Sequence, residues 1–391
     1  MPSSTSSSDS ALALTRGDAR EATPDRYARQ TAADRPGIAQ PVPVRPVPEQ
    51  PWGRILLGAT LLFALLLGGW EVYWRAYGVT PGFANDNGLW AIQRRRIDAG
   101  EGDATVIVSS SRPFFDIQLP VWERLDGRRP IQLAFEGTSP LAFAEDLADD
   151  PHFKGRLIIG IDPQVFFRGY TSHNGAIAYA HKQSPSQRVG QWISMHLIEP
   201  YFAFDDPDYA LETVLARQAW PARPGKPWLA QVRKLSQSEA DRNTHLWSKV
   251  ADDPQYLALV RSIWHQRFAP AQDPPPAELR QTTQEQIDRT AKAVAKLRAR
   301  GVQVLFLRSP SDGEYLTYET RLFPRASTWD VLLARSGAAG IHFQDYPELQ
   351  GYYLPEWSHM TRAEAERYTV ALYGVIQRDF WPPRAANGEA R

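Results

Sequence analysis

The chain contains no cysteine among its 391 residues, and its charged side chains leave it with no net charge. Without cysteine, disulfides and thiolate metal sites are excluded, although this absence does not distinguish the cytoplasm from the periplasm. The 44 Lys and Arg residues balance the 44 Asp and Glu residues, so the composition gives no reason to expect a nucleic-acid partner. With 43% hydrophobic residues, the chain can still bury a sizeable core.

One long apolar run lies near the N-terminus. Residues 55–70 carry no charge, and aromatic side chains flank them on both sides. These are Trp52, Trp70, Tyr73 and Trp74. A bilayer core requires roughly 20 apolar residues, and aromatic side chains concentrate at its two interfaces. We therefore expect a transmembrane helix over 54–74. A buried core helix and a cleaved signal peptide are the alternatives, but no small-residue cleavage site follows Gly69, which favours an uncleaved anchor.

The flanks of this run predict its orientation. Residues 1–53 are rich in Ser, Ala, Pro and Arg without periodicity, which predicts a disordered tail. The arginines that precede the run are Arg16, Arg20, Arg26, Arg29, Arg35, Arg45 and Arg54. Those that follow it closely are Arg75, Arg94, Arg95 and Arg96. Because positive residues favour the cytoplasmic side, we expect a cytoplasmic tail, a single span in a bacterial inner membrane and a periplasmic domain over 101–385, joined by a linker over 75–100.

Short apolar runs and helical patterns alternate in this domain. The runs, which suit strands buried on both faces, are 104–108, 131–135, 157–161, 302–307 and 340–343. The helical patterns between or after them are 118–125, 141–147, 278–300, 325–336 and 362–378. This order predicts an α/β fold with a flavodoxin-like, doubly wound parallel sheet. The aromatic-rich, proline-broken stretch over 164–273, with a helical piece at 252–268, is expected to be a large insertion that covers the active-site edge.

Two segments far apart in the sequence carry the residue types of a catalytic triad. Val106-Ile-Val-Ser-Ser-Ser-Arg112 is a predicted strand that ends in serines, and Pro355-Glu-Trp-Ser-His-Met360 places a carboxylate three residues before a histidine. A serine hydroxyl needs a base to take its proton, and the base needs a third group to orient its ring. Ser111, His359 and Glu356 suit these three roles. The alternative is that Ser111 only caps the helix that follows, and Ser110 is the second candidate nucleophile.

These segments resemble the first and last blocks of the SGNH/GDSL hydrolases, which are a strand followed by Gly-Asp-Ser and an Asp-x-x-His motif. Here Ser109-Ser110-Ser111 and Glu356-Trp-Ser-His359 stand in those places. The resemblance further implies that Gly137, after the second strand, shares an oxyanion hole with the N–H of Ser111. Two positions depart from the family: Ser109 replaces the glycine, and Asp162 stands where the third block has asparagine. A carboxylate at Asp162 cannot donate to an oxyanion.

Other polar residues have structural and functional interpretations. Arg112 is predicted to pair with Asp116 at helical spacing, a structural role that we favour over substrate binding. Arg308 ends the fourth predicted strand, where a salt bridge and a substrate contact are equally expected. The histidines other than His359 give no pair with zinc-site spacing and a third ligand, so we expect no metal and no cofactor. They are His152, His173, His181, His196, His245, His265 and His342.

An anchored domain of this type with a Ser-Ser first block looks like the bacterial envelope proteins of polysaccharide O-acylation, including those of alginate acetylation and teichoic-acid D-alanylation. The resemblance implies a serine acyltransferase or esterase that acts on a polysaccharide beside a polytopic membrane-bound O-acyltransferase. The alternative from another class is an inert SGNH-like scaffold or glycan-binding partner, which Ser109 and Asp162 favour. A lipid esterase facing the membrane is the third hypothesis. The analogy is one of architecture.

Overall fold

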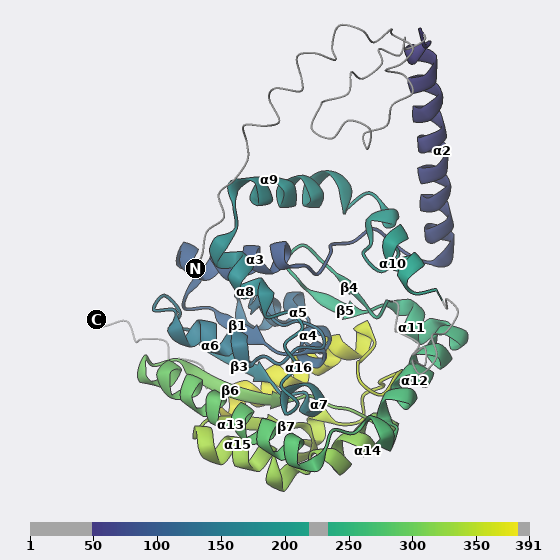
Figure 1. Cartoon of the computed structure of the whole chain (residues 1–391). Helices are drawn as coiled ribbons and strands as arrows, with labels where there is room; N and C mark the ends of the chain where they lie inside the picture. Colours follow the sequence, from purple (N-terminus) through teal and green to yellow (C-terminus); the bar gives the residue numbers. More distant parts are fainter. Residues whose placement is uncertain (1–48, 219–233, 382–391) are drawn as a thin grey trace, which may run out of the picture. The chain divides into compact units, whose positions relative to one another are not determined.

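The computed structural model describes residues 49–218 and 234–381. Its central element is a five-stranded parallel sheet with the strand order β2-β1-β3-β6-β7 (Figure 1). The strands are β1 (Thr105–Val108), β2 (Ile131–Gln132), β3 (Arg156–Gly160), β6 (Gln303–Arg308) and β7 (Ala339–His342). Every pairing between neighbours in this sheet is parallel. The prediction of an α/β fold with a parallel sheet is therefore confirmed.

The five predicted strands all form, with ends shifted by a few residues. β2 is shorter than the predicted run, but the N–H groups of Leu133 and Phe135 continue to donate to the carbonyls of Ile107 and Ser109. Every residue of β1 is buried, and successive side chains enter different clusters: Val106 and Val108 on one side, Ile107 on the other. A sheet that is apolar on both sides needs a layer of helices on each face.

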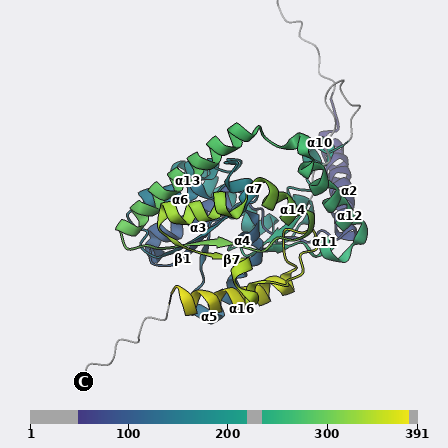
Figure 2. The same ribbon diagram turned by 90° about the horizontal axis from the view of Figure 1, so that it is seen from below.

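Helices cover both faces of the sheet (Figure 2). On one face lie α6 (Leu141–Asp149), α13 (Pro276–Ala299) and α15 (Trp329–Ser336). On the other lie α5 (Leu119–Asp126) and α16 (Arg362–Asp379). Each lies where the sequence predicted a helix, although the predicted helix over 325–336 is divided into a short 3-10 turn, η6 (Arg325–Ser327), and α15. Two further helices, α4 (Ser111–Asp116) and α14 (Gly313–Leu322), were not predicted as separate elements.

The apolar run near the N-terminus forms α2 (Trp52–Tyr77), which is the one helix in the described residues long and apolar enough for a membrane span or a signal sequence. The predicted tail over 1–53 falls almost wholly outside the described residues. A linker was predicted over 75–100. That segment contains α3 (Asn87–Arg96) and η2 (Ile97–Glu101), and Trp90 of α3 is 1% exposed because it packs in the core beneath the sheet. The segment contains few prolines and mixes polar with apolar residues, so its sequence did not reveal that α3 has a buried face.

The predicted insertion lies between β3 and β6. Before the gap at 219–233 it contains α7 (Pro163–Phe166), α8 (Gly175–Lys182), α9 (Pro185–Ile193), η3 (Ser194–Ile198), η4 (Ala203–Asp205) and α10 (Leu211–Ala216). After it come β4 (Ser236–Ser238), β5 (Thr244–Leu246), α11 (Ser248–Asp252), α12 (Pro254–Phe268) and η5 (Pro270–Gln272). β4 and β5 form a separate antiparallel pair. Aromatic side chains of this insertion form a third core cluster with Phe114 and Phe115 of α4.

Gly160, the last residue of β3, permits the close approach of Ser109, Ser110 and Ser111, which we call the serine turn. A Cβ at this position would lie 2.5 Å from the Cβ of Ser109 and 2.4 Å from the Cγ of Pro113. We expect Gly160→Ala to lower the free energy of unfolding by about 1–3 kcal/mol, because the added methyl group overpacks the junction of β3, β1 and α4. Denaturant unfolding measures the change. Gly190→Ala is the control, since a Cβ there meets nothing within 4 Å in the middle of α9. An unchanged stability in Gly160→Ala would contradict the tight packing.

Candidate active site

The serine turn follows β1, and its three hydroxyl groups lie in different environments. Ser109 is fully buried and donates from Oγ to the carbonyl of Ser110 at 2.7 Å. Ser110 is also fully buried, and its Oγ has no hydrogen-bond partner among the described residues. Ser111 begins α4 and is the only one of the three that is partly exposed. Because Ser111 is the first helical residue, its N–H has no acceptor within the helix.

Glu356 and His359 form a buried pair in the loop that precedes α16. One carboxylate oxygen, Oε1, accepts hydrogen bonds from the ring Nδ1 of His359 at 2.7 Å and from its backbone N–H at 2.6 Å. The other oxygen, Oε2, accepts from the indole Nε1 of Trp264 in α12 at 2.7 Å. Glu356 and His359 are 0% and 2% exposed. One carboxylate oxygen of Glu356 is therefore bound within its own loop, and the other is bound by the insertion.

The electrostatics of this pair fix the proton on His359. Burial alone would raise the pKa of the Glu356 carboxyl, but His359 and the hydrogen bonds to both oxygens hold that pKa below its ordinary value. An ionised carboxylate only accepts, so Nδ1 carries the proton and Nε2 of the neutral ring has the free lone pair. Burial opposes the imidazolium, yet the Glu356 charge raises the pKa of His359 above its ordinary value. Nε2 is thus a base.

The loop that carries Glu356 and His359 is held in an uncommon conformation. Trp357 has a φ of 71°, in the left-handed region that costs energy for a bulky residue. Its carbonyl accepts from the N–H of Asp312 at 2.8 Å, and Arg261 donates to the carbonyl of Pro355 at 2.9 Å. The loop after β6 and helix α12 therefore hold this turn in place from outside it. Neither contact is local in sequence, so sequence patterns gave no signal for them.

Ser111, Gly137 and His359 line one cavity of about 500 Å³. Trp264, Tyr315 and His173 are among the other residues that line it. Gly137 has a φ of 61°, which favours glycine, and no atom lies within 4 Å of where its Cβ would be. The two sequence segments predicted to meet do lie on the same cavity. Nε2 of His359 nevertheless has no hydrogen-bond partner among the described residues, so it is not bonded to Ser111 Oγ in this conformation.

Behind the serine turn lies a buried charge cluster. Glu319 of α14 accepts from Arg112 at 2.9 Å and from Arg308 at 2.7 Å, and all three side chains are at most 4% exposed. Arg112 also donates to Ser358 Oγ at 3.1 Å. The predicted pairing of Arg112 with Asp116 was wrong, because the guanidinium points to α14 rather than along its own helix. Of the two roles expected for Arg308, the salt bridge is present. Glu319 was missed, because its partners are distant in sequence.

Asp162 follows β3 and belongs to the same cluster. Its Oδ2 accepts from the backbone N–H of Arg112 at 3.3 Å, and its Oδ1 lies 3.7 Å from the Arg112 guanidinium. Asp162 is 3% exposed and is not among the described residues that line the cavity of Ser111. The carboxylate thus binds the N-terminus of α4 next to Ser111, and it supplies no donor for an oxyanion.

Asp116, at the end of α4, is a second buried carboxyl near His359. Burial raises its pKa to about 8, partly offset by His359 and by the N–H of Met360, which donates to Oδ1 at 3.1 Å. Its Oδ2 has no partner among the described residues. Burial thus favours the neutral form of the Asp116 carboxyl. Sequence reasoning noted this residue only as a partner for Arg112.

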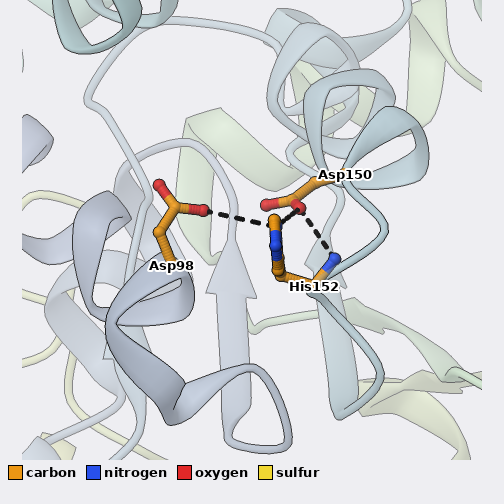
Figure 3. Close-up of side chains that lie close together, drawn as sticks. All are labelled: Asp98, Asp150 and His152. Carbon is orange, nitrogen blue, oxygen red and sulfur yellow. Dashed lines mark hydrogen bonds and ion pairs between the residues drawn. The ribbon is translucent and has the colours of Figure 1, made fainter.

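Asp98, Asp150 and His152 form another polar group (Figure 3), and none of the three lines this cavity. His152 Nδ1 lies 3.0 Å from Asp150 Oδ1 and 3.9 Å from Asp98 Oδ1. Arg94 already pairs with both carboxylates, at 2.6 Å from Asp150 and 3.6 Å from Asp98. A metal ion would have to compete with this guanidinium, so the group gives no argument for a metal site.

Comparisons with protein-family models, with curated proteins and with solved structures found no match for the chain.

Proposed function

We propose that the chain is a membrane-anchored serine acyltransferase or esterase with an SGNH-like domain. The observation that carries the proposal is the buried Glu356–His359 pair, whose free Nε2 belongs to a residue lining the same cavity as Ser111. The strand order supports the fold assignment, because counting only the strands of the main sheet gives 2-1-3-4-5, the flavodoxin-like order. The site also lies beyond the carboxyl ends of its strands, as ligand sites in such sheets do.

The proposed reaction uses each residue in one role. Nε2 of neutral His359 takes the proton of Ser111 Oγ while Oγ bonds to the carbonyl carbon of an acyl donor. The N–H groups of Ser111 and Gly137 donate to the developing oxyanion. The imidazolium, which Glu356 stabilises, returns its proton to the leaving group as that bond breaks, and an acyl ester remains on Ser111. A glycan hydroxyl or water then gives its proton to His359 while its oxygen bonds to the acyl carbon. The bond from that carbon to Ser111 Oγ breaks, and Oγ takes the proton back from His359, which restores the free enzyme.

The chemistry requires one adjustment of the site. Since Nε2 is not bonded to Ser111 in the structure, Oγ has to come within hydrogen-bond reach when an acyl donor binds. Catalytic hydrogen bonds are often long in unliganded enzymes and tighten in the complex. Ser111 is partly exposed at the start of a short helix, and a change of its side-chain rotamer is the adjustment that we propose.

The proposed setting is a bacterial inner membrane with the domain in the periplasm, where envelope or extracellular polysaccharide is the acyl acceptor. α2 is long and apolar enough to span a bilayer, and the arginines before it favour a cytoplasmic N-terminus. A polytopic membrane-bound O-acyltransferase would deliver acyl groups across the membrane to such a domain.

Trapping the acyl-enzyme tests this function. Brief reaction of the detergent-solubilised chain with an activated acetyl ester, followed by acid quench and peptide mass spectrometry, is expected to place one acetyl group on Ser111. A burst of leaving group equal to the enzyme concentration accompanies it. An acetyl group on Ser110 would mean that Ser110, and not Ser111, is the nucleophile. Absence of both the burst and the acetyl-serine would contradict the proposed enzymatic activity.

The pH dependence of the reaction follows from the Glu356–His359 pair. Only neutral His359 accepts a proton, and its pKa is raised, so kcat/KM is expected to rise with pH through a limb above the ordinary histidine value of 6.5. Glu356→Gln removes the charge that favours the imidazolium, whereas burial continues to oppose it, so the limb moves to lower pH. Stopped-flow rates with an acetyl ester between pH 5 and pH 9 measure the shift, a range chosen around the reference value for histidine. If the rising limb of kcat/KM lies at the same pH in Glu356→Gln as in the unaltered chain, a group other than His359 titrates there.

The second candidate function is an inert scaffold or glycan-binding partner in an envelope assembly. Asp162 favours it, because a carboxylate stands beside the serine turn where the family has an amide donor. In cells, this function is supported if deletion of the chain abolishes polymer acetylation while Ser111→Ala and His359→Ala leave it intact. Loss of acetylation in both variants would favour the enzyme.

A further inference from the structure

Helix α9 and the π-helical turn η3 that continues it have an apolar face on the outside. Val189, Trp192 and Leu197 are 58%, 55% and 56% exposed. Ile193 is 40% exposed, and the spacing of these residues places them along one helical stripe. The buried side of α9 instead carries the polar Gln191. A surface helix of a water-soluble domain has the opposite arrangement, with its apolar stripe towards the core.

The apolar surface continues past the end of η3. Tyr201 and Phe202 are 60% and 41% exposed. Contiguous exposed apolar residues on a soluble protein mark a surface that is covered by a partner or by a membrane. We call residues 189–202 the α9 segment.

Hydrogen bonds attach the end of this segment to α2. Glu71 accepts from the backbone N–H groups of Ala203 and Phe204 at 2.9 and 2.8 Å. Arg75 donates to the carbonyl of Tyr201 at 2.7 Å. Trp74, in the same turn of α2, is 5% exposed and its ring lies 4.3 Å from that of Tyr209. The C-terminal turns of α2 are thus part of the domain's packing, and the exposed stripe ends where α2 joins the domain.

We propose that the α9 segment is an interfacial helix, whose apolar face lies in the lipid headgroup region of the membrane that α2 spans. This inference goes beyond the proposed catalysis and rests on the proposed membrane span. A helix with a strong apolar face and tryptophan or tyrosine side chains prefers the boundary between headgroups and acyl chains. Arg188 and His196 lie exposed beside the stripe, where they can meet lipid phosphates.

The attachment of the α9 segment to α2 favours a lipid surface over a protein partner as the molecule that covers the stripe. The span of α2 brings its own C-terminal turns to the membrane surface. Arg75 in these turns binds Tyr201 of the α9 segment, and Glu71 binds Ala203 directly after it. Covering the stripe with lipid therefore needs no additional molecule. The consequence is a domain held to the membrane at two places, the span and the helix, rather than on a flexible tether.

The absence of cysteine permits a direct test in the full-length chain. Single variants Trp192→Cys and Leu197→Cys are labelled with an environment-sensitive fluorophore and reconstituted in phosphatidylcholine vesicles. Lys292→Cys, exposed on α13, is the aqueous control, and Leu65→Cys, 72% exposed in α2, is the control for the span. Each sample is quenched separately by nitroxide-labelled lipids and by iodide in the water phase. All four positions are on the surface, so the label does not disturb the core.

The expected result is loss of fluorescence with nitroxide lipids, and several-fold weaker iodide quenching than at Lys292→Cys, for both Trp192→Cys and Leu197→Cys. If these two labels are quenched by iodide and not by the lipids while Leu65→Cys is quenched by the lipids, the interfacial helix is overturned and a protein must cover the stripe. If Leu65→Cys is itself quenched only by iodide, the membrane span of the proposed function fails, and the inference with it.

Discussion

Ser111→Ala is expected to lower kcat/KM for acetyl transfer by a factor on the order of 10⁴–10⁶, the range for loss of a triad member. Without Oγ no acyl ester can form, and the free Nε2 of His359 has no hydroxyl to activate. His359→Ala should cost about as much, and the double variant little more, because the two residues act as one unit. Initial rates with an activated acetyl ester, corrected for spontaneous hydrolysis, measure these losses.

Ser110→Ala is the matched control, since it removes one hydroxyl from the adjacent position. Ser110 Oγ is fully buried, so its removal should leave the rate within a few-fold of the unaltered chain. If instead Ser110→Ala abolishes turnover and Ser111→Ala does not, the two serines exchange roles. If neither variant changes the rate, the measured turnover does not come from this site. The result would then favour the scaffold function over the enzyme.

Most of the fold could be predicted from the sequence because it depends on local periodicity. Runs such as 157–161 are apolar on both faces, and β3 forms there. The helical pattern over 278–300 likewise matches α13 closely, since one side of it is apolar and Gly301 follows its end with a φ of 81°. The sequence did not predict helix α3 within 75–100, where Trp90 packs into the core from a stretch with no clear apolar stripe.

The candidate site was predictable only in part, for a related reason. Glu356 and His359 are three residues apart, so their pairing is local and could be predicted from the motif. Trp264 donates to Glu356 across 92 residues, and Glu319 binds Arg112 across 207. Such contacts depend on how the elements fold together rather than on any pattern within one of them. The raised pKa of Asp116 also follows from burial, which single positions in a sequence do not reveal.

Glu319→Ala is expected to lower the free energy of unfolding by about 3–5 kcal/mol, the cost of breaking a buried ion pair by removing one partner. Glu319 is the carboxylate that both Arg112 and Arg308 bind, and its removal leaves two buried guanidinium groups with less compensation. Burial would raise the pKa of Glu319, but the two arginines hold it below its ordinary value, so the carboxyl is ionised at neutral pH. Urea unfolding of the detergent-solubilised chain measures the loss.

Glu314→Ala is the control within the same helix. Glu314 Oε2 lies 2.7 Å from the ring Nδ1 of His265, and the two side chains are 50% and 74% exposed, so removal of this surface contact should cost no more than about 1 kcal/mol. Arg112 keeps Asp162 as an ion-pair partner when Glu319 is removed. Glu319→Gln, which retains a hydrogen-bond acceptor, should have a stability between those of the two alanine variants. Equal stabilities for Glu319→Ala and Glu314→Ala would mean that water or a rearranged Asp162 replaces the carboxylate. The cluster would then not be what holds α14 against the serine turn.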